Sequence, residues 1–141
     1  MFVDGFARTT GTLADHPIAN GRDASESVSD VRAFTGQAFR AVETVEPLLR
    51  IPDGWAILLP SEAWEFAEDT PSISADRMLQ GAVLRHGQGR VAVFGEAAMF
   101  TAQERGGDGE TVRVGMNAPE APNNAQFALN VLHWLSGLTG E

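Results

Sequence analysis

Glu96 is the side chain whose position most suggests chemistry in this sequence of 141 residues. It lies just beyond the apolar run 90–94, next to Gly95. In open α/β sheets, ligands bind beyond the carboxyl ends of the strands. A carboxylate there could act as a base, bind a hydroxyl group or hold a cation. The structural alternative is that Glu96 stabilises the start of a helix over 97–103, because carboxylates favour helix N-termini.

His16 is the second candidate for catalysis. It follows Asp15 and precedes Pro17, so the pair could supply an imidazole base and a carboxylate that orients it. Adjacent side chains in an extended segment point in opposite directions, which weakens this interpretation. The alternative is a histidine that bonds to the backbone of its own loop.

Several amide side chains surround the segment before the last predicted helix: Gln103, Asn117, Asn123, Asn124 and Gln126. Amides bind sugars and other neutral polar ligands, but they also satisfy loop backbone and helix ends. We predict a ligand site formed by Asn117, Gln103 and Glu96. A turn role is the alternative for Asn117, and a helix cap suffices for Asn123.

The residue types exclude other chemistries. There is no cysteine, so disulfides, thiolate catalysis and cysteine-ligated metals are excluded within this chain. No zinc-type histidine motif, phosphate loop or dinucleotide glycine pattern occurs, and a strand rather than a helix follows Gly87-Gln88-Gly89. We therefore predict no metal and no cofactor.

Charge and hydropathy restrict the partners. The net charge is −9 and the pI is about 4.7, so a phosphate backbone would be repelled and nucleic acid is not expected. No apolar run approaches the ~20 residues that span a bilayer. No signal peptide is visible at the N-terminus, and the compartment stays open between cytoplasm and periplasm.

Two elements have clear sequence signatures. The β-type runs of 79–94, joined by a short link with glycines, predict an antiparallel hairpin. Because its second strand is apolar on both faces, we expect residues 90–94 inside a covered sheet. Apolar residues at helical spacing predict a helix over 124–136, capped by Asn123 and ended by Gly137.

The remaining elements are less regular. Residues 28–34 and 55–59 are predicted as strands. Residues 42–51 are ambiguous, because Pro47 argues against a helix interior and allows an edge strand. Ser61 could cap a helix over 62–68 that buries Trp64. The glycine-rich stretch 104–118 is predicted as a loop. A mixed sheet with a docked C-terminal helix would account for this order.

Four segments carry a resemblance to a known family: Asp15-His16-Pro17-Ile18, residues 87–96, Gly115-Met116-Asn117-Ala118-Pro119 and the helix 124–137 with Asn130 and His133-Trp134-Leu135. Together they resemble the C-terminal part of the class I glutamine-amidotransferase-like superfamily. The trehalose-utilisation-type and β-galactosidase trimerisation-type domains belong to the same group. The resemblance covers most of residues 11–140.

The resemblance implies one α/β domain over 1–141, with a flavodoxin-like or amidotransferase-like mixed sheet. The family has several parallel β-α units before the His-Pro-Ile region, and we expect the N-terminus to be truncated relative to it. Missing strands would expose a sheet edge, which makes a homo-oligomer an expected partner. The family's cysteine nucleophile is absent, and Gly95-Glu96-Ala97-Ala98 stands where its His-x-Glu pair would be.

Three functional hypotheses follow. The leading one is a non-catalytic binding or assembly domain, because the family pattern occurs without its nucleophile. An alternative is a hydrolase or sugar-processing enzyme, which requires Glu96 and His16 to lie within about 7 Å around one cleft. The third is a fragment that is inactive without the missing N-terminal units.

Overall fold

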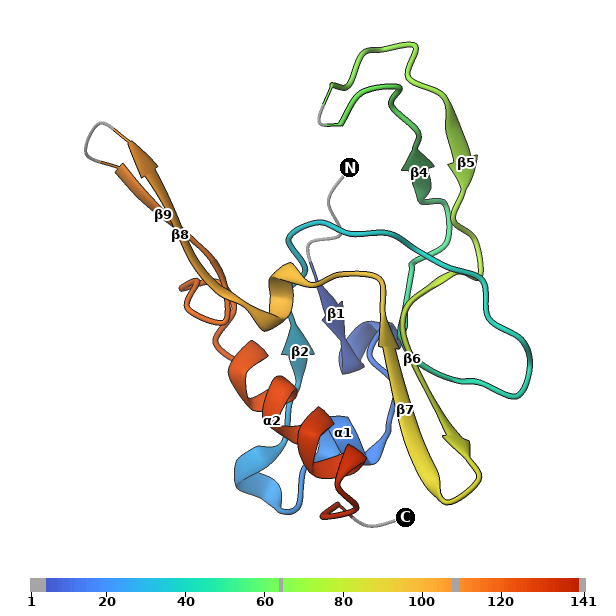
Figure 1. Ribbon diagram of the computed structural model, residues 1–141, viewed down its shortest axis with the longest axis vertical. Helices are drawn as coiled ribbons and strands as arrows, with labels where there is room; N and C mark the ends of the chain where they lie inside the picture. The colour runs from blue at the N-terminus through green and yellow to red at the C-terminus, as the bar shows by residue number, and fades with distance from the viewer. Residues whose placement is uncertain (1–4, 64, 108–109, 140–141) are drawn as a thin grey trace.

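A computed structural model describes residues 5–63, 65–107 and 110–139. A packed body carries two hairpins that project from it, β4–β5 and β8–β9 (Figure 1). The helical elements are η1 Arg8–Thr10, α1 Pro17–Asn20, η2 Ala24–Glu26, η3 Ala98–Phe100 and α2 Asn124–Leu135. The strands are β1 Phe6–Ala7, β2 Asp30–Val31, β3 Glu46–Arg50, β4 Ala56–Leu58, β5 Ser72–Ser74, β6 Leu79–His86, β7 Gly89–Phe94, β8 Ala102–Gly107 and β9 Glu110–Gly115.

The main sheet has the order β3-β6-β7, and both of its strand pairs are antiparallel. The predicted hairpin over 79–94 is confirmed, with Gly81 opposite Phe94 and His86 opposite Gly89. Gly87 has φ 58°, the positive φ that a type II′ turn requires at its first central residue. The ambiguous segment 42–51 contains β3, which takes the edge position that Pro47 allows, at the outside of this sheet.

The expected interior position of residues 90–94 is wrong. β7 is an edge strand, and the central strand is β6. Val91 and Val93 are 39% and 45% exposed, whereas Phe94 points inward and makes an edge-to-face contact with Phe127 of α2. An apolar composition on both faces therefore did not mean burial on both faces, because α2 covers only one of them.

The chain combines helices and strands, as expected for the coarse fold class. Its strands form a three-stranded sheet and three two-stranded ribbons rather than one mixed sheet, and every strand pair in the described residues is antiparallel. The parallel β-α units of a flavodoxin-like topology do not occur in this part of the chain. Parallel pairs need a long crossover connection, whereas four of the five pairs here are formed by consecutive strands.

Helix α2 forms where it was predicted. Phe127, Val131 and Trp134 are buried at helical spacing. The amides of Gly137 and Leu138 bond to the carbonyls of Trp134 and His133, which is the double bond of a Schellman ending. Asn123 takes the predicted N-cap position, but its side chain makes no capping hydrogen bond. Asn123 Nδ2 instead donates to Ser29 Oγ and Asp30 Oδ2.

Other boundaries differ from the prediction. The strand expected over 28–34 is reduced to β2, and the one over 55–59 to β4. The described residues of 62–68 contain no helix, and Trp64 lies outside the described residues. The helix expected over 97–103 is one turn, η3, before β8 begins. The stretch 104–118 contains most of the β8–β9 hairpin, because its glycines lie near the strand ends where they do not interrupt pairing.

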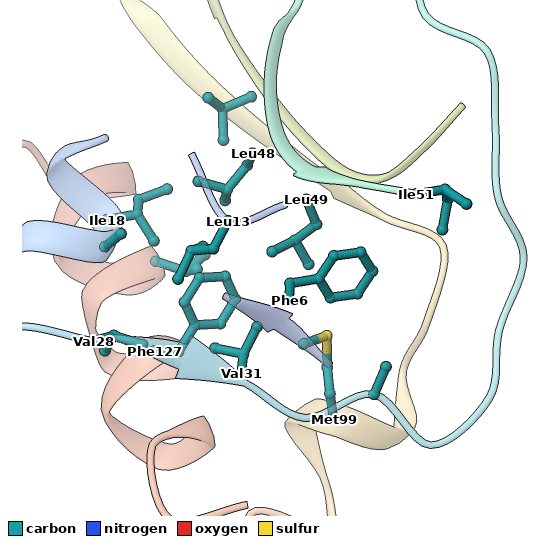
Figure 2. Packing of buried hydrophobic residues seen from close by; sticks show 14 of the residues in the cluster. Phe6, Leu13, Ile18, Val28, Val31, Leu48, Leu49, Ile51, Met99 and Phe127 are labelled. Carbon is teal, nitrogen blue, oxygen red and sulfur yellow. The ribbon is translucent and has the colours of Figure 1, made fainter. Parts of the chain in front are cut away.

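The hydrophobic core lies between the main sheet, α1, α2 and the β1–β2 ribbon (Figure 2). Phe6, Ile18, Leu48 and Phe127 are each fully buried in it. The polar contacts of α2 reinforce this packing, since Asn130 Nδ2 donates to the carbonyls of Ile18 and Glu26 at 2.9 and 2.8 Å. In the described residues, no helix combines the length and the apolar character needed to cross a membrane.

Candidate functional site

A cavity of about 250 Å³ opens between the β4–β5 hairpin and residues 35–38. Its walls are mainly apolar and include Trp55, Ile57, Leu58 and Phe66. None of the described residues that line it carries a charge. Ligand sites in proteins are concave and mostly apolar, with a few polar groups that orient the ligand. The cavity therefore has the general character of a site for a small molecule.

Gln80 is a buried polar side chain in the lining of this cavity, with only 3% of its surface exposed. Its Nε2 donates to the carbonyl of Thr35 at 2.9 Å, whereas its Oε1 has no hydrogen-bond partner. Because Thr35 O can only accept, the amide nitrogen must face it, and the unpartnered atom is an acceptor. An unsatisfied buried acceptor costs about 1–3 kcal/mol. Oε1 itself has almost no accessible surface, so it lies within the wall rather than on the surface of the cavity.

Residues 35–38 form one wall of the cavity, within a segment that runs across the end of the main sheet. Phe39 exchanges both backbone hydrogen bonds with Leu79 at 2.8 and 2.9 Å. Gln37 N donates to Gly95 O, and Gly95 N donates to Gln80 O, each at 2.8 Å. Because these backbone hydrogen bonds join the segment to Leu79 and Gly95, the wall is an extension of the main sheet.

Glu96 fixes the same wall through its carboxylate. Oε1 accepts hydrogen bonds from Phe34 N at 2.7 Å and from Thr35 N at 2.8 Å. The side chain is 4% exposed, and Oε2 has no partner. Burial raises the pKa of Glu96, and the two backbone N–H groups oppose this effect. Glu96 does not line the cavity, so its observed role is to position the residues that do.

Gly36 allows the wall to lie this close. Its φ is 117°, and a Cβ there would be 2.7 Å from Gln80 Nε2, from the Cβ of Glu96 and from Gly95 O. Any other residue at position 36 would therefore suffer both backbone strain from the positive φ and a steric clash of its Cβ. The close approach brings Gln80 and Glu96 against the same side of Gly36, where a side chain would otherwise stand.

His16 has a structural role at the start of α1. Its Nδ1 accepts a hydrogen bond from Ile18 N at 3.1 Å, and its ring makes an edge contact with Trp134 at 5.4 Å. Burial lowers its pKa, as the largest of several effects. His16 therefore bonds to the backbone of its own segment, as the structural alternative predicted.

Glu96 and His16 do not share a site. Arg90, near the start of β7, lies over the Trp134 ring at 5.3 Å and donates to Trp134 O at 2.7 Å, and Trp134 contacts His16. Glu96 lies beyond the far end of the same strand, six residues later. At ~3.3 Å per residue, roughly 20 Å of extended backbone separates Arg90 from Glu96. The charges that act on His16 come from Glu46, Arg85, Arg90 and Asp15 and not from Glu96, so the two side chains belong to different neighbourhoods.

The structure brings Asn117 and Gln103 together at the base of the β8–β9 hairpin. Asn117 Nδ2 donates to Gln103 O at 3.4 Å, and Gln103 Nε2 donates to Thr101 Oγ1 at 2.8 Å. Neither residue lines the cavity, and Glu96 bonds to the 34–35 backbone instead. Two of the three predicted ligand residues, Asn117 and Gln103, therefore contact each other, whereas the hydrogen bonds of Glu96 are with residues 34–35.

The role of Gln80 was not predicted from the sequence, although its position in the sequence is unusual. It is the only strongly polar residue in the apolar run Leu79-Gln80-Gly81-Ala82-Val83-Leu84. Buried polar side chains need partners, so a glutamine within an apolar central strand indicates a specific contact. The partner, Thr35, lies 45 positions away and has no local signature.

In the ranges that the structure describes, no three His, Asp or Glu side chains lie close enough to hold a metal ion. Comparisons with protein-family models, with curated proteins and with solved structures found no significant match to this chain.

Proposed function

We propose that this chain is a non-catalytic binding module that holds a small ligand in the cavity beside Gln80. The observation that carries the proposal is the mostly apolar cavity of about 250 Å³, which Trp55, Ile57 and Phe66 line together with the buried amide residue Gln80. The separation of Glu96 from His16 weighs against the hydrolase alternative. Descent from the amidotransferase-like superfamily remains part of the proposal, supported by the hairpin and the terminal helix but not by the antiparallel pairing.

Ligand binding can be tested by NMR on the whole chain. Neutral ring compounds, sugars and amino acids would be added singly while the indole N–H of Trp55 and the amides of Gly36 and Gln37 are followed. We expect saturable shifts at these positions with at least one compound. Ala56→Phe, which fills the cavity, should abolish them, whereas Ala125→Phe on the exposed side of α2 should not. Shifts with no compound, or shifts confined to other residues, would contradict the proposal.

Assembly is the second candidate, and the outer face of α2 supports it. Leu129, Leu132 and Leu135 are 49%, 58% and 38% exposed. The helix contains no Asp, Glu, Lys or Arg, although the chain carries a net charge of −9. Two copies of so acidic a molecule repel each other least where neutral faces meet. We therefore propose that α2 pairs with α2 of a second copy.

Sedimentation equilibrium at rising concentration tests this pairing. We expect the mass to approach twice the 15.1 kDa of one chain, and Leu132→Lys to keep the protein monomeric. Val112→Lys is the matched control, because Val112 is equally exposed but lies on β9. A wild-type monomer at the highest concentration would refute the assembly role.

A further inference from the structure

We infer that a second copy of this chain adds to the main sheet through β7, which pairs antiparallel with β7 of that copy. The inference rests on the assembly role proposed for α2 and specifies the geometry of the dimer. Three observations lead to it: the unpaired backbone groups of β7, the protected opposite edge of the sheet and the side chains that β7 presents.

The outer edge of β7 presents a row of unpaired backbone groups. Gly95 N donates to Gln80 O at 2.8 Å, and the register with Gly81 opposite Phe94 continues this ladder along the hairpin. Because hydrogen-bonded pairs alternate in an antiparallel ladder, every second residue of β7 directs its N–H and C=O groups away from β6. These residues are Arg90, Ala92 and Phe94. In the part of the chain that the structure describes, no strand pairs with this side of β7 and no other backbone group bonds to it.

The opposite edge of the main sheet, β3, is protected. Leu13 forms an antiparallel bridge with Leu49 on the outer side of β3, and Arg50 N donates to Thr12 O at 2.9 Å. Pro47 has no N–H group to offer, and the register of β3 shifts twice. Coverage, proline and bulges are the usual means of protecting an edge strand. In contrast, β7 contains no proline and pairs with β6 in one continuous register over its whole length.

The side chains of β7 also suit contact with a second copy. The strand contains no Asp or Glu, although the chain has a net charge of −9, so two copies repel each other least at such a surface. Its one charged residue, Arg90, is directed toward α2, where it donates to Trp134 O at 2.7 Å. Val91 and Val93, on the other face, are 39% and 45% exposed. Covering these valines would add an apolar contribution to the hydrogen bonds of the pairing.

One register pairs all the outward residues of β7. A two-fold axis beside Ala92 places this residue opposite the partner's Ala92, and Arg90 opposite the partner's Phe94. Any shift along the strand leaves an outward residue of each copy unpaired. The axis of such a symmetric antiparallel pair is perpendicular to the sheet, so the same face of each copy lies on the same side. Both α2 helices, which contact β7 from one face through Phe127 and Phe94, therefore lie on one side of the continuous sheet.

Amide hydrogen exchange tests the pairing on the wild-type chain, by NMR at low and at high concentration. The outward amides of β7 can exchange only from the monomer, so those of Arg90, Ala92 and Phe94 should slow roughly 10-fold when about 90% of the chains are dimeric. The amides of Ala56 and Leu58 are the internal control, because they point away from β5 at the edge of β4 and belong to no proposed interface. Exchange at the three β7 amides that does not slow in a dimeric sample would overturn the inference.

Disulfide cross-linking tests the register, because the chain has no cysteine of its own. Val91 and the partner's Val93 would form a non-hydrogen-bonded pair with Cα atoms ~4.5 Å apart, which a disulfide can bridge. We expect a mixture of Val91→Cys and Val93→Cys, with one variant isotope-labelled, to oxidise mainly to the mixed dimer. A mixture of Val91→Cys with Val112→Cys is the control and should give no excess of mixed dimer, since Val112 is 52% exposed but lies on β9. Mixed dimer in only statistical proportion from the first mixture would contradict the pairing.

The outcomes separate this inference from the proposed pairing of α2. A dimer that Leu132→Lys abolishes, but that leaves the exchange of the outward β7 amides unchanged, would overturn the β7 pairing and leave the helix pairing. Slowed exchange that persists in Leu132→Lys would support the β7 pairing and remove the helix pairing. A wild-type monomer at the highest concentration would overturn both, and the binding role of the cavity would be unaffected.

Discussion

Gly95→Ala is expected to lower the free energy of unfolding by roughly 3 kcal/mol or more and to abolish ligand binding. A Cβ at this position would lie 1.8 Å from Gln37 O and 3.0 Å from the Gln37 carbonyl carbon. Both are backbone atoms, so the clash can be relieved only if residues 34–37 move away from the sheet. Overpacking typically costs ~1–3 kcal/mol, and more when backbone must shift.

This movement would break the hydrogen bond from Gln37 N to Gly95 O and would open the wall of the cavity. Urea unfolding measures the loss of stability. Gly89→Ala at the start of the same strand is the matched control, because its Cβ would meet only His86 O at 3.5 Å, an ordinary contact. We expect the control to stay within about 0.5 kcal/mol of wild type. Equal effects of the two variants would contradict the role of the close approach.

Glu96→Ala is expected to lower the free energy of unfolding by about 3 kcal/mol. The substitution leaves the backbone N–H groups of Phe34 and Thr35 without their acceptor, and each unsatisfied buried group costs about 1–3 kcal/mol. Glu96→Gln keeps an amide oxygen for both donors, so at neutral pH it should stay within about 1 kcal/mol of wild type. If both substitutions cost the same, the carboxylate is not the acceptor that holds this wall.

A comparison of wild type with Glu96→Gln also tests the charge state of Glu96. Burial raises the pKa of Glu96 above its ordinary value of 4.5. Folding therefore favours the protonated carboxyl, and its contribution to stability is fully present below pH 4.5 and is lost as the pH rises through the folded-state pKa. Wild type should lose stability relative to Glu96→Gln across this interval. Urea unfolding of both proteins in the same buffers from pH 4.5 upward measures the difference, and a difference independent of pH would refute the raised pKa.

The elements predicted well are those whose signals are local. The hairpin over 79–94 has a glycine at the turn position that needs positive φ, and α2 has buried residues at helical spacing with a glycine after its end. Each signal lies within a few residues of the structure it specifies. The hairpin β8–β9 was missed for the converse reason: its glycines indicate a loop, and only the pairing of its strands shows that they are hairpin ends.

The candidate site could not be predicted in the same way. The sequence singled out Glu96 from its place after an apolar strand, but its partners Phe34 and Thr35 lie more than 60 positions earlier. One oxygen of its carboxylate accepts hydrogen bonds from two backbone N–H groups, which are present in any sequence. The cavity itself is assembled from the 35–38 segment, β4 and β6, and no spacing along the chain relates these segments.

The sequence by itself determined the turn, the helix and the neutral composition of α2, because backbone preference and side-chain spacing act between near neighbours. It also determined that Gln80 is a polar residue in an apolar strand. The tertiary structure alone decided that β7 lies at an edge, that Glu96 holds a loop and that Gln80 has a free acceptor. Burial and hydrogen-bond partnership depend on which distant surfaces meet, and this is settled only when the whole chain has packed.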